Sequence, residues 1–286
     1  MKRFAVSFGT CVLIAIFASL PAAFASDPLS QLIDDYLAKR PTKALQRDLN
    51  LSDAYAAQQK FVEQLIPKLG PRVGYKVGLV TKQTQERYGA SRPMRGVLLR
   101  DMMLKDGAEV PLSFGTRPLV EADLIVVVKD EGINSTKTPL EVAQHLTEIV
   151  CFIELPDTIV DAALTTDVGM LIAGGAGARA GVLGQRAPVK PTAEFVEAFG
   201  EMQMTMTDQT GKELAAAKAK VILGHPLNAV LWLIKDLSVS GQKLKAGDLL
   251  SLGSIAPPQP PQSGQTVKLR YEGLPGGPLS ATVHFK

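Results

Sequence analysis

The chain has 286 residues, of which 46% are hydrophobic and 21% charged, a balance that is ordinary for a globular protein and ample for a large buried core. The formal net charge is only +3, and no run of basic residues with interleaved aromatic residues occurs. These features argue against a nucleic-acid partner and against binding to an anionic membrane surface. We expect one large domain, with or without a small appendage.

Residues 1–25 have the pattern of a secretory signal peptide. Lys2 and Arg3 precede an apolar run over 11–20, and an Ala-Phe-Ala motif at 23–25 supplies the small residues typical of a cleavage site. The alternative, an uncleaved membrane anchor, needs roughly 20 apolar residues, which is more than this run contains. Cleavage after the motif would lower the formal charge from +3 to +1. The signal-peptide pattern predicts a periplasmic or secreted protein that has no membrane association once it has been cleaved.

The mature chain would keep one cysteine, Cys151, because Cys11 lies in the predicted signal peptide. A lone cysteine cannot form an internal disulfide, and the neighbours of Cys151 are apolar. We therefore expect a buried, unreactive thiol and a fold held together by its core alone.

Residues 26–72 predict an N-terminal helical segment. Apolar residues recur on one helical face over 29–37, Ser52 is a candidate cap for a second helix, and Gly70 followed by Pro71 is a typical helix end.

Over 73–286 the pattern changes to short β segments with few helices. We expect a helix that starts at Thr138-Pro139 and runs to 146, and another that runs from His225-Pro226 to 237. Residues 158–185 are rich in glycine and alanine and predict a loop near the site, with a mobile linker as the alternative. Strands are expected at 73–80, 96–104, 110–112, 119–128, 149–155, 248–252, 266–270 and 280–285, and a hairpin at 202–221 whose methionines face the core. The order predicts an α+β protein dominated by strands.

Three acidic residues have positions that favour a metal site. Glu121 and Asp123 are two residues apart at the start of a strand, so both side chains point to one face. Glu154 lies within an apolar strand, where an unpaired acid would be costly. Three oxygen ligands suit a hard cation, Mg²⁺ or Mn²⁺. The alternative is that these acids are solvated or paired with Lys or Arg.

Lys76 places a charged group inside the apolar segment GYKVGL at 74–79. Such a lysine can hold a substrate carboxylate or, with a depressed pKa, shuttle protons. A salt bridge to one of the acids, or a lysine that reaches the surface, is the alternative.

Taken in order, these segments resemble the 2-oxopent-4-enoate hydratases and 4-oxalocrotonate decarboxylases of the fumarylacetoacetase-like superfamily. The resemblance covers essentially the whole mature chain. It rests on DAYAAQ at 53–58, GYKVGL at 74–79, VEAD at 120–123 followed by Glu154, GHP at 224–226, LKAGD at 244–248 and Gly253-Ser254.

The resemblance implies a fumarylacetoacetase C-terminal-like mixed β-roll or sandwich with flanking helices, a catalytic domain over 73–286 and a homo-oligomer. It also implies Mg²⁺ or Mn²⁺ held by the three acids, Lys76 as the active-site lysine, and substrate contacts at Gly253 and Ser254. The implied activity is that of a carbon–oxygen lyase. A 2-hydroxy-2,4-dienoate or 2-oxopentenoate-type acid chelates the cation, ketonises and takes up water at C4, giving a 4-hydroxy-2-oxo acid.

Three departures from the family pattern bear on the substrate. Met94 stands where the hydratases carry an acid, and Asp101 is a possible substitute or simply a strand-end surface residue. The segment 173–184 has lost the family's polar residues but contains Arg179, which either grips an anionic group of the substrate or is a solvated loop residue. The signal peptide is itself unusual for this family.

Other activities remain open at this stage. A decarboxylase or a C–C hydrolase would use the same enolate-stabilising site, although a hydrolase needs a base and His145 is the only remote candidate. We assign His225 to a helix start and not to the metal. A non-catalytic periplasmic carboxylate-binding protein on the same fold is the alternative from another class. The missing acid at Met94 favours it, whereas Lys76 together with three acids favours an enzyme.

Overall fold

The computed structural model describes Met1 and residues 27–161, 163 and 167–286. Apart from Met1, the predicted signal peptide, residues 1–25, lies outside the described residues. Within the described ranges, no helix has both the length and the apolar character that crossing a bilayer requires.

Two N-terminal helices, α1 (Pro28–Leu37) and α2 (Leu51–Leu69), occupy the segment where helices were expected. The predicted cap at Ser52 is wrong, because the Asn50 side chain accepts a hydrogen bond from the backbone N–H of Asp53 and caps α2 two residues earlier than expected. Gly70 ends α2 with a φ of 78°, a backbone conformation that favours glycine.

A seven-stranded mixed sheet carries the residues of greatest interest. Its order is β2-β1-β10-β5-β6-β7-β3. β10 comes late in the chain yet lies between β1 and β5, parallel to the first and antiparallel to the second. The strands are β1 (Arg72–Gly78), β2 (Met94–Leu99), β3 (Met103–Lys105), β5 (Glu121–Val128), β6 (Leu146–Leu155), β7 (Ala180–Pro188) and β10 (Leu249–Ser251).

A second sheet of five strands packs against the first, in the order β4-β12-β11-β8-β9. The predicted hairpin is confirmed as β8 and β9, and Met202, Met204 and Met206 are buried in the core as expected. The strands are β4 (Ala108–Val110), β8 (Gln203–Thr207), β9 (Glu213–Lys218), β11 (Thr266–Glu272) and β12 (Leu279–Phe285).

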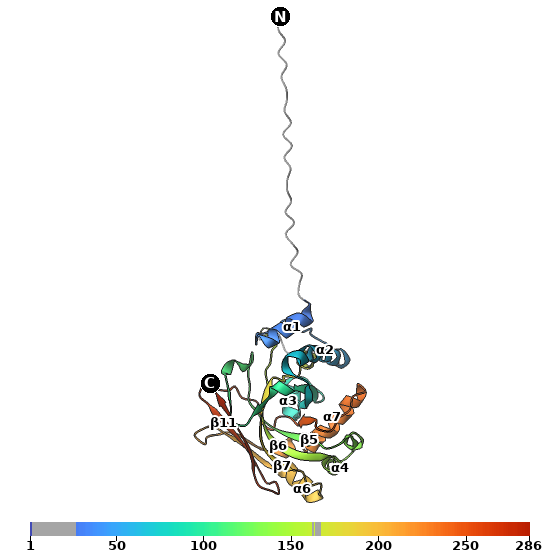
Figure 1. The fold of residues 1–286 in the computed structure, drawn as a ribbon, viewed down its shortest axis with the longest axis vertical. Coiled ribbons are helices and arrows are strands. Elements are labelled where there is room, and N and C mark those ends of the chain that lie inside the picture. The colour runs from blue at the N-terminus through green and yellow to red at the C-terminus, as the bar shows by residue number, and fades with distance from the viewer. Residues whose placement is uncertain (2–26, 162, 164–166) are drawn as a thin grey trace.

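Helices cover the ends and one side of this pair of sheets. In Figure 1, α1 and α2 lie at one end of the molecule, and α7 lies on the side opposite β11. The remaining helices are α3 (Lys82–Arg87), α4 (Pro139–Gln144), α5 (Val168–Ala173), α6 (Ala193–Glu201) and α7 (Leu227–Val239), with 3-10 turns η1 (Arg100–Met102), η2 (Leu112–Phe114), η3 (Glu131–Ser135) and η4 (Ala219–Val221). The predicted fold class, α+β with a mixed β-roll and flanking helices, is confirmed.

The main core lies between the two sheets and under α4, α6 and α7. Alternate residues of β5, such as Leu124 and Val126, face this core, so Glu121 and Asp123 face the other way. Cys151 is also in this core, where burial raises the pKa of its thiol, as expected for an unreactive cysteine.

The loop predicted over 158–185 is wrong at 168–173 and from 180 onward, where the segment holds α5 and β7. Its glycines permit close packing instead of mobility. A Cβ on Gly181 would lie 2.0 Å from the ring of Phe152, and one on Gly184 would lie 2.4 Å from the carbonyl oxygen of Ser280. The turn at 174–178 between α5 and β7 is irregular, with positive φ at Gly175, Ala176 and Gly177.

Candidate active site

Three carboxylates meet on the face of the seven-stranded sheet that is turned away from the main core. Glu121 and Asp123 alternate along β5, and Glu154 of β6 is the direct cross-strand partner of Glu121. Asp123 and Glu154 are 0% and 2% exposed. The sheet register therefore brings together side chains that are distant in sequence.

Lys76 of β1 reaches the same face, and its Nζ forms an ion pair with Oε1 of Glu154. Burial opposes the charge on Lys76, but Glu154, Glu121 and Asp123 outweigh this effect, so the pKa of Lys76 is raised above its ordinary value. The lysine is a cation at neutral pH. The hypothesis of a depressed lysine pKa does not hold in this environment.

Asp123 is held by its own hydrogen bonds. It accepts from the Ser251 hydroxyl at 2.5 Å and from the backbone N–H groups of Leu124 and Gly253 at 2.5 and 3.0 Å. In the described part of the chain, no three Asp, Glu, His or Cys side chains are arranged to hold a metal ion as they stand. The assignment of Glu121, Asp123 and Glu154 as ligands of a divalent cation stays a prediction.

The charge balance of the cluster nevertheless fits a divalent cation. Burial, followed by repulsion from Glu154, raises the pKa of Glu121 to about 8 and that of Asp123 to about 7. Three carboxylates with one ammonium group leave an excess of negative charge in a buried place. All-oxygen donors are the kind that Mg²⁺ and Mn²⁺ prefer.

A cleft opens over Lys76, Glu121 and Glu154, with a cavity volume of about 100 Å³. The size suits a small acid. Its walls are mostly apolar and include Val77, Leu79, Val80, Met94, Leu119, Pro156, Leu171, Ala176 and Pro258, and Ser254 also lines it.

The two substrate contacts predicted at Gly253 and Ser254 differ in their position relative to the cleft. Ser254 lines the cleft, although its hydroxyl donates to the carbonyl oxygen of Ala256 at 2.6 Å. Gly253 lies behind the cleft and contributes its backbone N–H to Asp123. A side chain there would be strained, since φ is 103° and a Cβ would meet the backbone of Val77 at 2.7 Å.

The structure corrects the prediction for Arg179. Both interpretations, a substrate contact and a solvated loop residue, are wrong in this structure. Its side chain is only 9% exposed, forms an ion pair with Asp157 at 2.8 Å, and stacks 3.6 Å above the centre of the Tyr36 ring. It also donates to the carbonyl oxygen of Tyr36. Arg179 therefore joins α1 to the end of β6 and is not among the residues that line the cleft.

Other candidates for proton transfer lie elsewhere. Asp101 is exposed and forms an ion pair with Arg100, as expected for a surface residue, while Met94, at the position where the family resemblance implies an acid, lines the cleft. His145 caps the end of α4 and pairs with Asp130, and His225 accepts from the N–H of Leu227 at the start of α7. The assignment of His225 to a helix start is confirmed.

The sequence analysis missed one wall of the cleft, formed by Thr84, Arg87 and Tyr88 in and after α3. The segment 82–87 has no apolar residue and therefore no helical period to detect. Its capping box could have indicated the helix, because Thr81 and Thr84 satisfy each other's backbone N–H groups.

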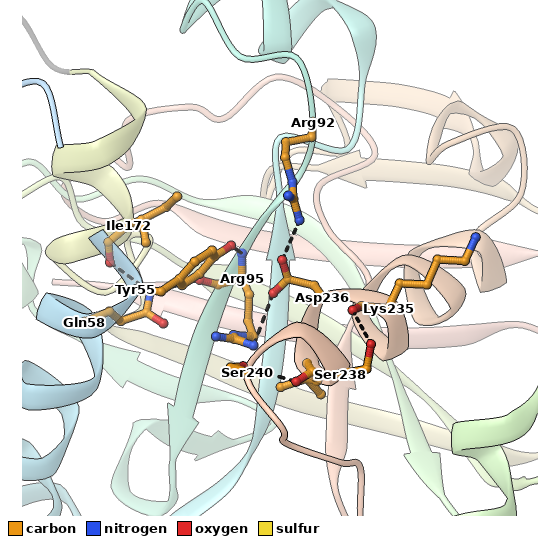
Figure 2. A network of polar contacts seen from close by, with 10 residues as sticks. Tyr55, Gln58, Arg92, Arg95, Ile172, Lys235, Asp236, Ser238 and Ser240 are labelled. Carbon is orange, nitrogen blue, oxygen red and sulfur yellow. Dashed lines mark hydrogen bonds and ion pairs between the residues drawn. The ribbon is translucent and has the colours of Figure 1, made fainter. Parts of the chain in front are cut away.

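Strand β2 is anchored behind the cleft by a polar network (Figure 2). The Arg95 side chain stacks on Tyr55 of α2 and forms an ion pair with Asp236 of α7 at 3.1 Å, while its backbone N–H donates to the Tyr55 hydroxyl. Gln58 donates to the carbonyl oxygen of Arg95 at 2.9 Å. Next along the strand, a Cβ at Gly96 would lie 2.7 Å from Cγ of Lys76, so this anchored strand shapes the space around the lysine.

The fold is of the fumarylacetoacetase-like class. No family model matches the sequence. The chain is 29% identical over 228 residues to the 2-keto-4-pentenoate hydratase of Paraburkholderia xenovorans (strain LB400), covering 79% of this chain and 82% of that one. It is 28% identical over 234 residues to the 2-oxo-hept-4-ene-1,7-dioate hydratase of Escherichia coli, covering 79% and 85%.

Among solved structures, the chain is similar to 4-oxalocrotonate decarboxylase from Pseudomonas putida G7 complexed with magnesium and adipate. The TM-score is 0.80 at 21% identity, over 91% of this chain and 96% of that chain, which shows a shared fold. Together these likenesses show that the chain shares the fumarylacetoacetase-like fold and is similar in sequence to 2-keto-4-pentenoate and 2-oxo-hept-4-ene-1,7-dioate hydratases.

Proposed function

We propose that the protein is a metal-dependent hydratase, a carbon–oxygen lyase that adds water to a small 2-hydroxy-2,4-dienoate to give a 4-hydroxy-2-oxo acid. The observation that carries this proposal is the buried lysine among acidic groups at the base of a small apolar cleft. Such a costly cluster favours a functional site. The hydratase relatives match most of the chain at 28–29% identity.

In this proposal Glu121, Asp123 and Glu154 hold Mg²⁺ or Mn²⁺, which supplies stabilisation of negative charge on a 2-oxo acid. Lys76, which remains charged, neutralises the substrate carboxylate. The apolar walls contact the carbon chain and exclude water from all but the reacting position. The raised pKa values of the acids show why a cation is favourable here, since it would offset their mutual repulsion.

The test is turnover of 2-hydroxypenta-2,4-dienoate by residues 26–286 with Mg²⁺ or Mn²⁺, followed by loss of ultraviolet absorbance. Lys76→Met should lower turnover by on the order of 100-fold or more. Asp101→Asn, a change at an exposed acid outside the cleft, is the matched control and should have no effect. No absorbance change with either cation would contradict the hydratase.

Calorimetry separates the cation from catalysis. Mg²⁺ should bind the unmodified protein and should fail to bind Glu154→Gln, because the substitution removes a donor and a charge from the cluster. Asp101→Asn should bind as the unmodified protein does. Absence of binding to the unmodified protein would contradict the metal site.

A second candidate is a carboxylate-binding protein without turnover, and Met94 is the observation that favours it. This side chain occupies the cleft wall where the family has an acid, so a group for proton transfer is missing there. Binding of the dienoate without its consumption would support this candidate. Release of CO₂ from a 2-oxo-dioate would instead support a decarboxylase. A C–C hydrolase is disfavoured because no histidine lines the cleft in the described part of the chain.

We also propose that the protein acts in the periplasm or outside the cell, after cleavage of residues 1–25, as a homo-oligomer. The signal-peptide pattern supports the first part. The second part rests on the family resemblance, which implies a homo-oligomer. Light scattering after size exclusion measures the assembly directly.

A further inference from the structure

We propose that the preferred substrate is a dicarboxylic 2-oxo acid, whose distal carboxylate is bound by Arg87 at the mouth of the cleft. The inference rests on the proposed function of the same site and deepens it by naming a substrate class. It comes from a residue that the sequence motifs do not include.

Arg87 combines exposure with an uncommitted charge. It is the last residue of α3, it is exposed, and it lines the cleft together with Thr84 and Tyr88. No carboxylate of the described residues pairs with it, and its guanidinium lies 5.7 Å from the centre of the Tyr88 ring. By contrast, Lys82 on the same helix is paired with Glu86 and is not a lining residue.

The cleft has two cationic positions separated by apolar walls. Lys76 is 4% exposed and lies at the base, whereas Arg87 lies where the cleft meets solvent. The walls between include Leu79, Val80 and Leu171. A carbon chain with a 2-oxo acid at one end and a second carboxylate at the other would satisfy both ends and bury its apolar middle.

An arginine in the last turn of a helix also has an ordinary explanation, since it interacts favourably with the helix dipole. That role does not require a place in the cleft wall. The guanidinium is the side chain best suited to bind a carboxylate with two parallel hydrogen bonds, and the acidic cluster at the base repels a second carboxylate there. The distal acid therefore has one favourable place, at the mouth.

The test compares two pairs of acids that differ only at the far end. Binding is measured by calorimetry with 2-oxoadipate and 2-oxohexanoate in the presence of Mg²⁺, and turnover with 2-hydroxyhepta-2,4-diene-1,7-dioate and 2-hydroxyhepta-2,4-dienoate. The unmodified protein should prefer the diacid of each pair. In Arg87→Gln this preference should fall by on the order of 10- to 100-fold, mainly through Kd and KM. Lys82→Gln should keep the preference.

The two proposals fail in different ways. Equal binding of the two oxo acids by the unmodified protein, or an unchanged preference in Arg87→Gln, would overturn the dicarboxylate inference even if both dienoates are consumed. Diacid-selective binding that depends on Arg87 without consumption of either dienoate would support the inference and contradict the hydratase.

Discussion

At Lys76 one ammonium group faces three carboxylates in a buried place. The free-energy cost of burying these charged groups indicates a functional site. A charged side chain inside an apolar strand costs several kcal/mol unless it is compensated. The ion pair with Glu154 compensates both partners, whose side chains are 5% and 3% exposed. Glu121 and Asp123 remain less well balanced, and their raised pKa values follow from this.

Removal of Lys76 should therefore destabilise the fold. Lys76→Met leaves Glu154 buried without its partner, and we expect the free energy of unfolding to fall by about 3–5 kcal/mol in urea titrations at neutral pH without metal. The double variant Lys76→Met/Glu154→Gln should recover part of this loss, because the uncompensated charge is gone. A double variant that is less stable by the sum of the two single losses would show that the pair is not coupled.

Stability should also depend on pH through Glu121 and Asp123. Their folded pKa values of about 8 and 7 lie above the ordinary values near 4, so the folded protein holds protons that the unfolded chain has released. This contribution is favourable at low pH and is lost as pH rises from about 4 to 8. The Tm of the metal-free protein should fall over this range.

Addition of Mg²⁺ should reverse the effect, because the cation competes with protons for the same carboxylates. We expect the rise in Tm on adding Mg²⁺ to be larger at pH 8 than at pH 6. Glu121→Gln should have a shallower dependence of Tm on pH. A metal effect that is equal at both pH values would contradict the assignment of these acids to the cation.

At the scale of elements, the contact of β2 with α7 supports the cleft from behind. Arg95 and Asp236 are 6% and 5% exposed at their side chains, whereas Arg92, which also contacts Asp236 at 2.6 Å, is 40% exposed. The two arginines thus make ion pairs with one carboxylate in different environments. Figure 2 shows Asp236 between them.

This difference predicts unequal effects of substitution. Asp236→Ala leaves Arg95 buried without an anionic partner and should lower the free energy of unfolding by about 3–5 kcal/mol. Arg92→Ala removes the more exposed partner and should cost about 1 kcal/mol or less. Chemical denaturation of both variants measures the contrast, and equal losses would mean that burial does not decide the strength of this network.

The glycine-rich segment 158–185 shows where element prediction failed. Glycine frequency was interpreted as a loop, but β7 uses glycine where the Phe152 ring and the backbone of Ser280 approach it. The prediction was correct in one respect, since Leu171, Ala176 and Gly177 line the cleft. Glycine occurs both where the backbone needs conformational freedom and where another group packs closely against it. Only the atoms around the glycine in the folded protein distinguish the two cases.

At the scale of the whole molecule, the order of strands assembles the site from distant segments. β10 lies between β1 and β5, so Ser251 bonds to Asp123 across 128 residues of sequence. β1, β5, β6 and β10 each contribute one or more polar groups to one face. A change in sheet order would separate them all.

The predicted export of the protein is tested with the full-length chain. Expressed in a Gram-negative bacterium, it should be recovered from the periplasm with an intact mass that corresponds to a first residue of Ser26. Ala25→Arg should block processing, because the cleavage site needs a small residue at that position. Recovery of the unprocessed full-length chain from the cytosol would contradict the proposal.

The sequence by itself predicted which charged residues of the strands share a face and which are buried. Alternation along β5 predicted that Glu121 and Asp123 share a face, and the apolar neighbours of Glu154 and Lys76 predicted their burial. These are local properties, since the period of a strand and the cost of a buried charge are contained in a few adjacent residues.

Only the tertiary structure decided which of these groups meet and how they are paired. In the folded chain Asp123 accepts a hydrogen bond from Ser251, Arg179 forms an ion pair with Asp157, and Arg87 lies at the mouth of the cleft. None of these contacts has a local signal, because each joins elements whose relative position depends on sheet order and packing. Periodicity reports which face of an element is buried, and the packing of the whole molecule decides what lies against it.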